Sequence, residues 1–186
     1  RHTTFKCDWS SDVCSSDLSP GEFLTGKPVD ILLATIDRFA IRPDRFEVEV
    51  TEETIHDLTG VGAELRRLVD TGVRIAIDDF GAGHSSLVKL ASLPFGRLKI
   101  DRSLIAGIDA SEKNAQLIGT LINLGAQLNF SVLAEGVETR AEADMLGRYG
   151  CTEAQGFHFS RPVAAKEIVA KAREQRAEVE RLKRIS

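Results

Sequence analysis

The stretch Ile75-Ala76-Ile77-Asp78-Asp79-Phe80-Gly81-Ala82-Gly83 decides the fold of this chain. The short apolar run at 73–77 contains β-branched residues and predicts a buried parallel strand. Two carboxylates then stand side by side, and at about 4 Å and an effective dielectric of about 20 they repel by roughly 4 kcal/mol. A divalent cation would remove this repulsion, and Mg²⁺, Mn²⁺ and Ca²⁺ suit oxygen ligands. The alternative is a solvated turn in which one Asp caps the next helix.

Composition bounds the class of protein. The chain has 186 residues, 42% of them hydrophobic, which is enough to bury the core of one domain. The formal net charge of −4 argues against binding to DNA or RNA polymers. No apolar run is long enough for a membrane span. The three cysteines show no metal-binding spacing and suit a reducing cytosol. We expect a cytoplasmic domain, with membrane anchoring of a longer parent protein left open.

Residues 1–20 differ from the rest of the chain. They contain the near-repeat Ser10-Ser11-Asp12-Val13 and Ser15-Ser16-Asp17-Leu18, and they show neither a helical nor a strand period. They resemble translated sequencing-adapter read-through, and a native disordered arm is the alternative. We expect an aberrant, non-native segment at 1–20 and a domain at 21–186.

From residue 21 onward, segments with helical and strand periods alternate. Helices are predicted at 29–40, 54–69, 86–92, 111–128, 139–149 and 164–183, and strands at 46–50, 73–77, 97–100, 131–134 and 153–155. Such alternation predicts an α/β fold with parallel strands and right-handed crossovers.

Polar residues cluster where each predicted strand ends. They are Glu49, Glu52, Asp78, Asp79, Lys99, Asp101, Glu135, Glu138 and Gln155. The carboxyl ends of parallel strands lie on one face of a barrel or open sheet, where sites are built. The convergence of seven carboxylates with one lysine and one amide predicts a site rather than solubilising charge. A series of independent helix N-caps is the alternative.

Five motifs carry a family resemblance. They are Glu49-Val50-Thr51-Glu52, Asp78-Asp79-Phe80-Gly81-Ala82-Gly83, Lys99-Ile100-Asp101, Ala134-Glu135-Gly136-Val137-Glu138-Thr139, and Gly150-Cys151 through Gln155-Gly156-Phe157. In this order and spacing they resemble the EAL domain over about residues 21–175. The resemblance implies a TIM-like (β/α) barrel and the activity of a cyclic di-GMP phosphodiesterase in bacterial signalling.

The resemblance also implies a two-metal site for Mg²⁺ or Mn²⁺. Glu49 matches a metal ligand, Asp78 the carboxylate that bridges both metals, and Asp79 a ligand of the second metal. Glu135 matches a further ligand of that metal or a general base. Two such ions would activate water and clamp the attacking and leaving oxygens during displacement at phosphorus.

Other matching residues have supporting roles in the family. Lys99 resembles the group that holds the attacking water, and Asp101 and Glu138 resemble residues that support it. Glu52 matches the residue that steadies the loop after the Asp pair. Gln155 would stand near the substrate or a metal-bound water. For Lys99 the alternative is a plain salt bridge to Asp101 or Glu135.

Two family ligands have no match in this chain. The resemblance implies the Glu of a Glu-Ala-Leu motif and an Asn on the following strand, and we find neither in the sequence. We therefore expect an incomplete barrel whose first strands are missing and which begins at the helix before the third family strand. A full barrel has eight strands and typically about 250 residues. Hydrolysis should be impaired in this chain.

Three functions follow from these patterns. The first is hydrolysis of cyclic di-GMP to linear pGpG, in a parent protein that carries an upstream GGDEF or sensory domain. The second is a degenerate EAL domain that binds cyclic di-GMP as a non-catalytic sensor. The third is a barrel aldolase or lyase with Lys99 as Schiff-base nucleophile, which the neighbouring acids disfavour because they keep the lysine protonated. The oligomeric state stays open, with a homodimer among the options.

Overall fold

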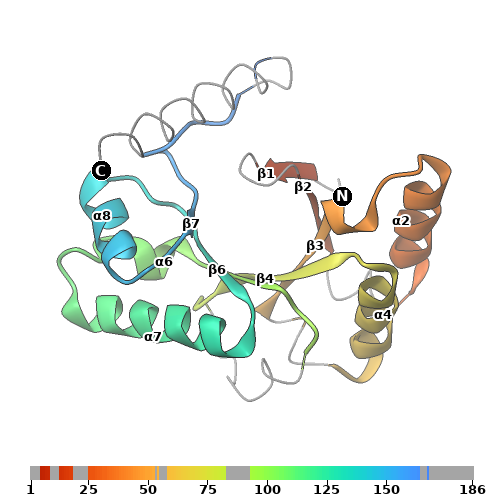
Figure 1. Cartoon of the computed structure of the whole chain (residues 1–186), viewed down its shortest axis with the longest axis horizontal. Helices are drawn as coiled ribbons and strands as arrows, with labels where there is room; N and C mark the ends of the chain where they lie inside the picture. Colours follow the sequence, from red (N-terminus) through yellow and green to blue (C-terminus); the bar gives the residue numbers. More distant parts are fainter. Residues whose placement is uncertain are drawn as a thin grey trace.

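The computed structural model describes residues 5–8, 13–18, 25–52, 54, 58–82, 93–163 and 167. A seven-stranded sheet in the order β1-β2-β3-β4-β5-β6-β7 forms its centre (Figure 1). Neighbours from β2 to β7 pair in parallel, whereas β1 and β2 are antiparallel. The strands are β1 (Phe5–Asp8), β2 (Val13–Leu18), β3 (Phe46–Thr51), β4 (Arg74–Phe80), β5 (Arg97–Ile100), β6 (Ser131–Ala134) and β7 (Glu153–Ala154).

Helices alternate with the strands, as the sequence predicts. They are α2 (Lys27–Arg38), α4 (Leu58–Thr71), α6 (Arg102–Ile105), α7 (Glu112–Leu128) and α8 (Arg140–Arg148), with a short 3₁₀ helix at Pro43–Arg45. The predicted helices at 29–40, 54–69, 111–128 and 139–149 are confirmed with shifted ends, and α6 was not predicted. The helices predicted at 86–92 and 164–183 lie outside the described residues, apart from the single position 167.

The sheet has an apolar face and a polar face. Alternate residues such as Val48, Val50 and Ile77 are fully buried in one core together with Leu65 of α4 and Ile118 of α7. The residues between them on the strands are charged and also buried: Glu47, Glu49, Asp78, Arg97 and Lys99. Because strand side chains alternate between faces, the helices cover the apolar face and leave the charged side chains on the other. This placement puts the predicted site inside the curve of the sheet.

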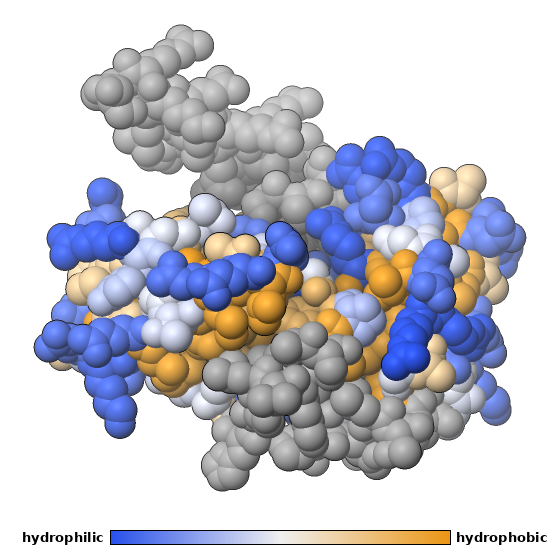
Figure 2. All heavy atoms as spheres, turned by 60° about the horizontal axis from the view of Figure 1, so that its bottom comes forward, coloured by the Kyte–Doolittle hydropathy of each residue, from blue (hydrophilic) through white to orange (hydrophobic). Residues whose placement is uncertain are grey.

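The outer surface follows from this layering. Figure 2 shows hydrophilic residues gathering at the two ends of a face, with hydrophobic residues between them. Within the described ranges, no helix combines the length and the apolar character that a bilayer crossing needs.

Part of the segment 1–20, which shows no strand period in the sequence, forms strands in the structure. Two strands lie there, and β2 pairs with β3 over five register pairs, from Cys14↔Phe46 to Leu18↔Val50. The sheet therefore has one parallel strand before β3 that the sequence reasoning excluded. The strand order is linear, with β1 and β7 as the edges of the described sheet, so the barrel is partial.

Candidate active site

Lys99 lies at the centre of the polar cluster. Its Nζ is 2.9 Å from Glu49 Oε1, 2.7 Å from Asp78 Oδ1 and 2.9 Å from Glu135 Oε1. Only 3% of the lysine side chain is exposed. Three carboxylates thus surround one ammonium group in a site that is almost closed to solvent.

Successive strands bring these groups together. Glu49 lies on β3, Asp78 on β4 and Lys99 on β5, while Glu135 follows directly after β6. Gln155 follows directly after β7, and its Nε2 donates a hydrogen bond to Glu135 Oε1. All five therefore lie toward the carboxyl ends of parallel strands, which is where sites form in this architecture.

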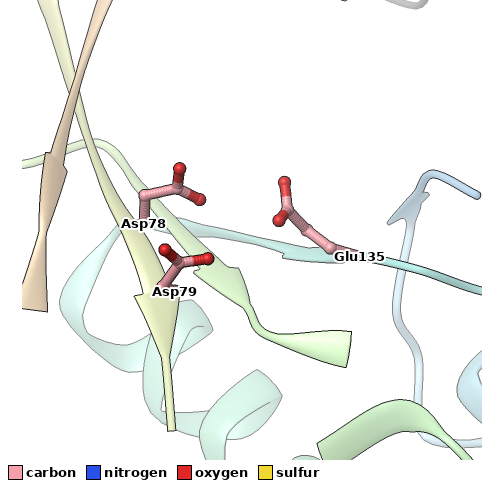
Figure 3. A group of neighbouring side chains, drawn as sticks. All are labelled: Asp78, Asp79 and Glu135. Atoms are coloured by element: carbon pink, nitrogen blue, oxygen red, sulfur yellow. The ribbon is translucent and has the colours of Figure 1, made fainter. Parts of the chain in front are cut away.

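The Asp pair departs from regular strand geometry. Asp79 has a φ of 54°, and the register between β4 and β5 shifts between Ile77 and Phe80. In a regular strand, neighbouring side chains point to opposite faces. Here one carboxylate oxygen each from Asp78, Asp79 and Glu135 lies within 4.8 Å of the other two. Figure 3 shows the three side chains grouped together. The local irregularity is what allows two consecutive residues to serve one site.

A buried glutamate holds the turn after the Asp pair. Glu52 Oε2 accepts a hydrogen bond of 3.1 Å from the amide of Gly81. Gly81 has a φ of 104°, and a Cβ there would lie 2.2 Å from Leu104 Cδ1. The turn therefore requires glycine both for its backbone conformation and for its close packing.

Asp101 and Glu138 make their described contacts away from Lys99. Asp101 caps helix α6 by accepting a hydrogen bond of 2.8 Å from the Ser103 amide. Hydrogen bonding to the side chain and the amide of Ser103 lowers the pKa of Asp101. Glu138 forms a half-exposed ion pair of 3.0 Å with Arg102. The structure thus brings together Glu49, Asp78, Asp79, Lys99, Glu135 and Gln155 but places these two beside the cluster.

The charges within the cluster shift its proton equilibria. Burial alone would lower the pKa of Lys99, but Glu135, Glu49 and Asp78 outweigh it and hold that pKa well above its usual value. Burial raises the pKa of Glu135, and the ammonium of Lys99 offsets only part of this rise. A Schiff-base nucleophile must be a neutral amine, so these surroundings oppose the aldolase interpretation.

The oxygens present fit a divalent cation. Two ligands on opposite sides of an ion bound at about 2.1–2.4 Å lie roughly 4.2–4.8 Å apart. The separations within the group formed by Asp78, Asp79 and Glu135 stay inside that limit. All three donors are carboxylates, which suit Mg²⁺, Mn²⁺ and Ca²⁺ rather than soft metals.

Sequence reasoning missed two features near the site. The first is a second buried charged group formed by Glu47, Arg97 and Glu153. Its signal was present, because Glu47 and Glu49 alternate along one strand and so share a face. The second is the position of Asp17, which pairs in register with Glu49. The family resemblance implies an asparagine on the strand that follows the Glu-Ala-Leu strand, and β2 has an aspartate at the register position of Glu49.

Known proteins resemble this chain in sequence. The model of the EAL domain family matches residues 11–162. Signaling protein YkoW of Bacillus subtilis is 40% identical over 153 residues, which are 82% of this chain and 19% of YkoW. MucR of Pseudomonas aeruginosa, named as a bifunctional diguanylate cyclase/cyclic di-GMP phosphodiesterase, is 38% identical over 164 residues, which are 88% of this chain and 24% of MucR. The chain thus spans about a quarter or less of these relatives.

Solved structures share its fold. The PaMucR phosphodiesterase in complex with c-di-GMP has a TM-score of 0.77 and 37% identity, covering 83% of this chain and 63% of that one. BlrP1 of Klebsiella pneumoniae, in a complex with manganese and cyclic di-GMP, has a TM-score of 0.70 and 34% identity, covering 80% of this chain and 38% of that one. The match to the family model covers most of the chain, including all five motifs, and the chain belongs to the EAL domain family.

Proposed function

We propose that this chain is the catalytic part of a cyclic di-GMP phosphodiesterase. The proposal rests on two groups of side chains that share Asp78 and Glu135. One is Lys99 with its three carboxylates, and the other is the oxygen cluster of Asp78, Asp79 and Glu135. In the reaction, the oxygen of a water molecule bonds to phosphorus and one P–O ester bond breaks, which gives linear pGpG. The similarity to solved complexes of cyclic di-GMP supports this choice of substrate.

The cluster divides into metal ligands and groups that act on water. Glu49, Asp78, Asp79 and Glu135 would hold Mg²⁺ or Mn²⁺, which when bound supplies Lewis-acid stabilisation of negative charge on the phosphate. Lys99 orients the attacking water and offsets developing negative charge, because its ammonium group is fixed and buried. Glu135 accepts the proton of that water when it does not serve as a ligand.

The remaining residues position these groups. Glu52 fixes the turn that follows the Asp pair, and Gln155 orients Glu135 and the substrate beside it. Asp101 caps helix α6, which starts at Arg102, and so it supports the chain just after the end of β5. Glu138 supports the chain that follows β6, because it forms an ion pair with Arg102 of α6.

The proposal also covers the parent protein of this chain: its further domains, its location and its oligomeric state. MucR is named as bifunctional, which supports an upstream diguanylate-cyclase (GGDEF) domain, or a sensory domain, in the parent of this chain. The cysteine composition supports a cytoplasmic site. A homodimer stays a prediction, which sedimentation of the purified chain tests.

Hydrolysis of cyclic di-GMP tests the proposal. The 186-residue chain is incubated with cyclic di-GMP and Mg²⁺ or Mn²⁺, and pGpG is separated by chromatography. We expect slow turnover that EDTA and Asp78→Asn both abolish, since the sequence contains no Glu-Ala-Leu motif. Turnover that survives both treatments would overturn the assignment.

Binding without turnover would favour the sensor alternative. Lys99 already neutralises part of the carboxylate charge, and this observation supports a site that can persist without metal. Calorimetry with cyclic di-GMP in EDTA separates the two functions. A sensor binds the nucleotide in EDTA, whereas the phosphodiesterase proposal requires the divalent cation for productive binding.

A further inference from the structure

A second charged layer lies below the proposed site. Arg97 Nη1 is 2.8 Å from Glu47 Oε1, and Arg97 Nη2 is 2.8 Å from Glu153 Oε2. Arg97 Nε also donates a hydrogen bond of 3.2 Å to Ser131 Oγ. Exposure falls to 7% for the Arg97 side chain and 4% for that of Glu47. One guanidinium group thus joins four strands: its own β5, together with β3, β6 and β7.

Each charged member of this layer stands two residues before a member of the site. Arg97 precedes Lys99, Glu47 precedes Glu49, and Glu153 precedes Gln155. Residues two apart on a strand point to the same face and lie roughly 6.6 Å apart along it. The contacts of Arg97 with Glu47 and Glu153 therefore fix how β3, β5 and β7 are aligned along their axes. These strands carry or precede the site residues.

Among the strands that Arg97 contacts, β7 depends most on this ion pair for its position. It is two residues long and pairs with β6 through Leu133↔Glu153 and Ala134↔Ala154. The backbone then continues the pairing through Gln155 N to Ala134 O (2.9 Å) and Val137 N to Gln155 O (3.0 Å). A strand this short has little sheet pairing of its own. The ion pair from Arg97 reaches it across β6.

We propose that Arg97, acting through Glu153, is a positioning residue that holds β7 in register and thereby keeps Gln155 against Glu135. The effect on catalysis rests on the proposed phosphodiesterase function, whereas the effect on β7 does not. A buried ion pair is weak evidence for added stability, because desolvation offsets much of its attraction. Its value here is geometric, since it joins strands that are not neighbours in the sheet.

Hydrogen exchange tests the positioning step by itself. Glu153→Gln keeps the size and hydrogen-bonding capacity of the side chain but removes its charge, and 25% exposure of Glu153 makes a folded variant attainable. We expect the amides of Gln155 and Val137 to exchange about tenfold faster or more, because the local opening of β7 becomes easier. The amide of Glu135, which bonds Ile100 O at 3.0 Å, should keep its rate.

The matched control removes an ion pair elsewhere. Arg140→Met breaks the pair with Asp144 on the surface of α8, where 80% of the arginine side chain is exposed. It should leave exchange at Gln155 unchanged. Unchanged exchange at Gln155 in Glu153→Gln, or equal acceleration across all strands, would overturn the proposal.

A double-mutant cycle tests the link to the site. KM and kcat for cyclic di-GMP are measured for Glu153→Gln, Gln155→Ala and the double variant with Mn²⁺. If Glu153 acts through Gln155, the double variant should be no worse than Gln155→Ala, whereas independent effects would multiply. Multiplying effects would contradict the proposal. If the wild-type chain shows no turnover, the proposed function fails, and hydrogen exchange still decides the positioning role.

Discussion

At the scale of single residues, we expect the positive charge of Lys99 to stabilise the site, because it neutralises three neighbouring carboxylates. Lys99→Met leaves the buried Glu49 and Asp78 and the partly buried Glu135 without their shared cation. Breaking a buried pair in this way costs about 3–5 kcal/mol, so the melting temperature in EDTA should fall. Mg²⁺ should then raise the melting temperature of Lys99→Met more than that of the wild type, because the cation replaces the missing charge. Thermal melts with and without Mg²⁺ measure this difference.

The control for Lys99 is a lysine on the surface. Lys113 is exposed on α7, and Lys113→Met should melt like the wild type with and without Mg²⁺. An equal Mg²⁺ response in wild type and Lys99→Met would show that the lysine and the metal do not share the same carboxylates.

Gly156 lies directly after Gln155 and tolerates no side chain. A Cβ there would stand 2.1 Å from Val137 O, and its φ is 156°. Gly156→Ala must therefore displace the Gln155 segment, and overpacking of this kind costs about 1–3 kcal/mol. Gly147→Ala in helix α8 is the matched control, because a Cβ there meets nothing within 4 Å. Urea unfolding should show a loss for Gly156→Ala and no loss for Gly147→Ala, and equal midpoints would contradict the packing argument.

Motif spacing predicted which polar residues meet at the strand ends, but not how they pair. Glu49, Asp78 and Glu135 follow successive strands, so parallel topology alone places them together. Asp101 follows a strand too, yet its side chain caps α6 through the Ser103 amide. The sequence does not distinguish a capping acid from a site acid, because both occur where a strand ends and a helix begins.

At the scale of elements, Glu142 connects helix α8 to the loop after α6 by a hydrogen bond. Its carboxylate accepts hydrogen bonds from the amides of Gly107 (3.1 Å), Glu138 (2.8 Å) and Thr139 (3.0 Å). Burial alone would raise the pKa of Glu142, but these three bonds outweigh it and lower that pKa. Glu142→Gln weakens the acceptors and should destabilise the chain by roughly 1–3 kcal/mol at neutral pH.

The pH dependence of this effect has a definite sign. The folded pKa of Glu142 lies below its unfolded value, which is roughly 4.3. The stabilisation is therefore complete above the unfolded pKa and is lost as the pH falls through the folded pKa. Urea unfolding at several pH values should show wild type and Glu142→Gln converging in acid. Asp144→Asn on the same helix is the control, and a constant difference between wild type and Glu142→Gln at every pH would argue against the charged acceptor.

Elements with a clear period were predictable, and elements that depend on contacts were not. The strand at 73–77 shows as an apolar run and the helix at 111–128 as a helical period in the sequence, and both form, as β4 and α7. Helix α6 has four residues, too few to show a period, and depends on its cap at Asp101. Strand β2 holds Ser15, Ser16 and Asp17, which have low strand propensity, so its pairing with β3 overrides its composition.

At the scale of the whole molecule, β2 decides whether β3 is an edge. The family model matches from residue 11, so β2 lies inside the matched region. If residues 1–20 are foreign to the domain, as their composition suggested, their removal should cost nothing. The observed pairing predicts the opposite, because five register pairs join β2 to β3. Removal would uncover a strand whose Val48 and Val50 are buried.

Deletion of residues 1–20 should therefore lower the melting temperature and promote association through the open edge of β3. Thermal melts and light scattering of the full and shortened chains measure both effects. Ser16→Pro separates pairing from mere chain length, because proline removes a backbone donor in β2, opposite Val48. Ser16→Ala, which keeps the backbone donor at the same position, is the control. We expect Ser16→Pro to behave like the deletion and Ser16→Ala like the full chain. If the shortened chain has the melting temperature and light scattering of the full chain, residues 1–20 do not stabilise the domain, and the prediction is wrong.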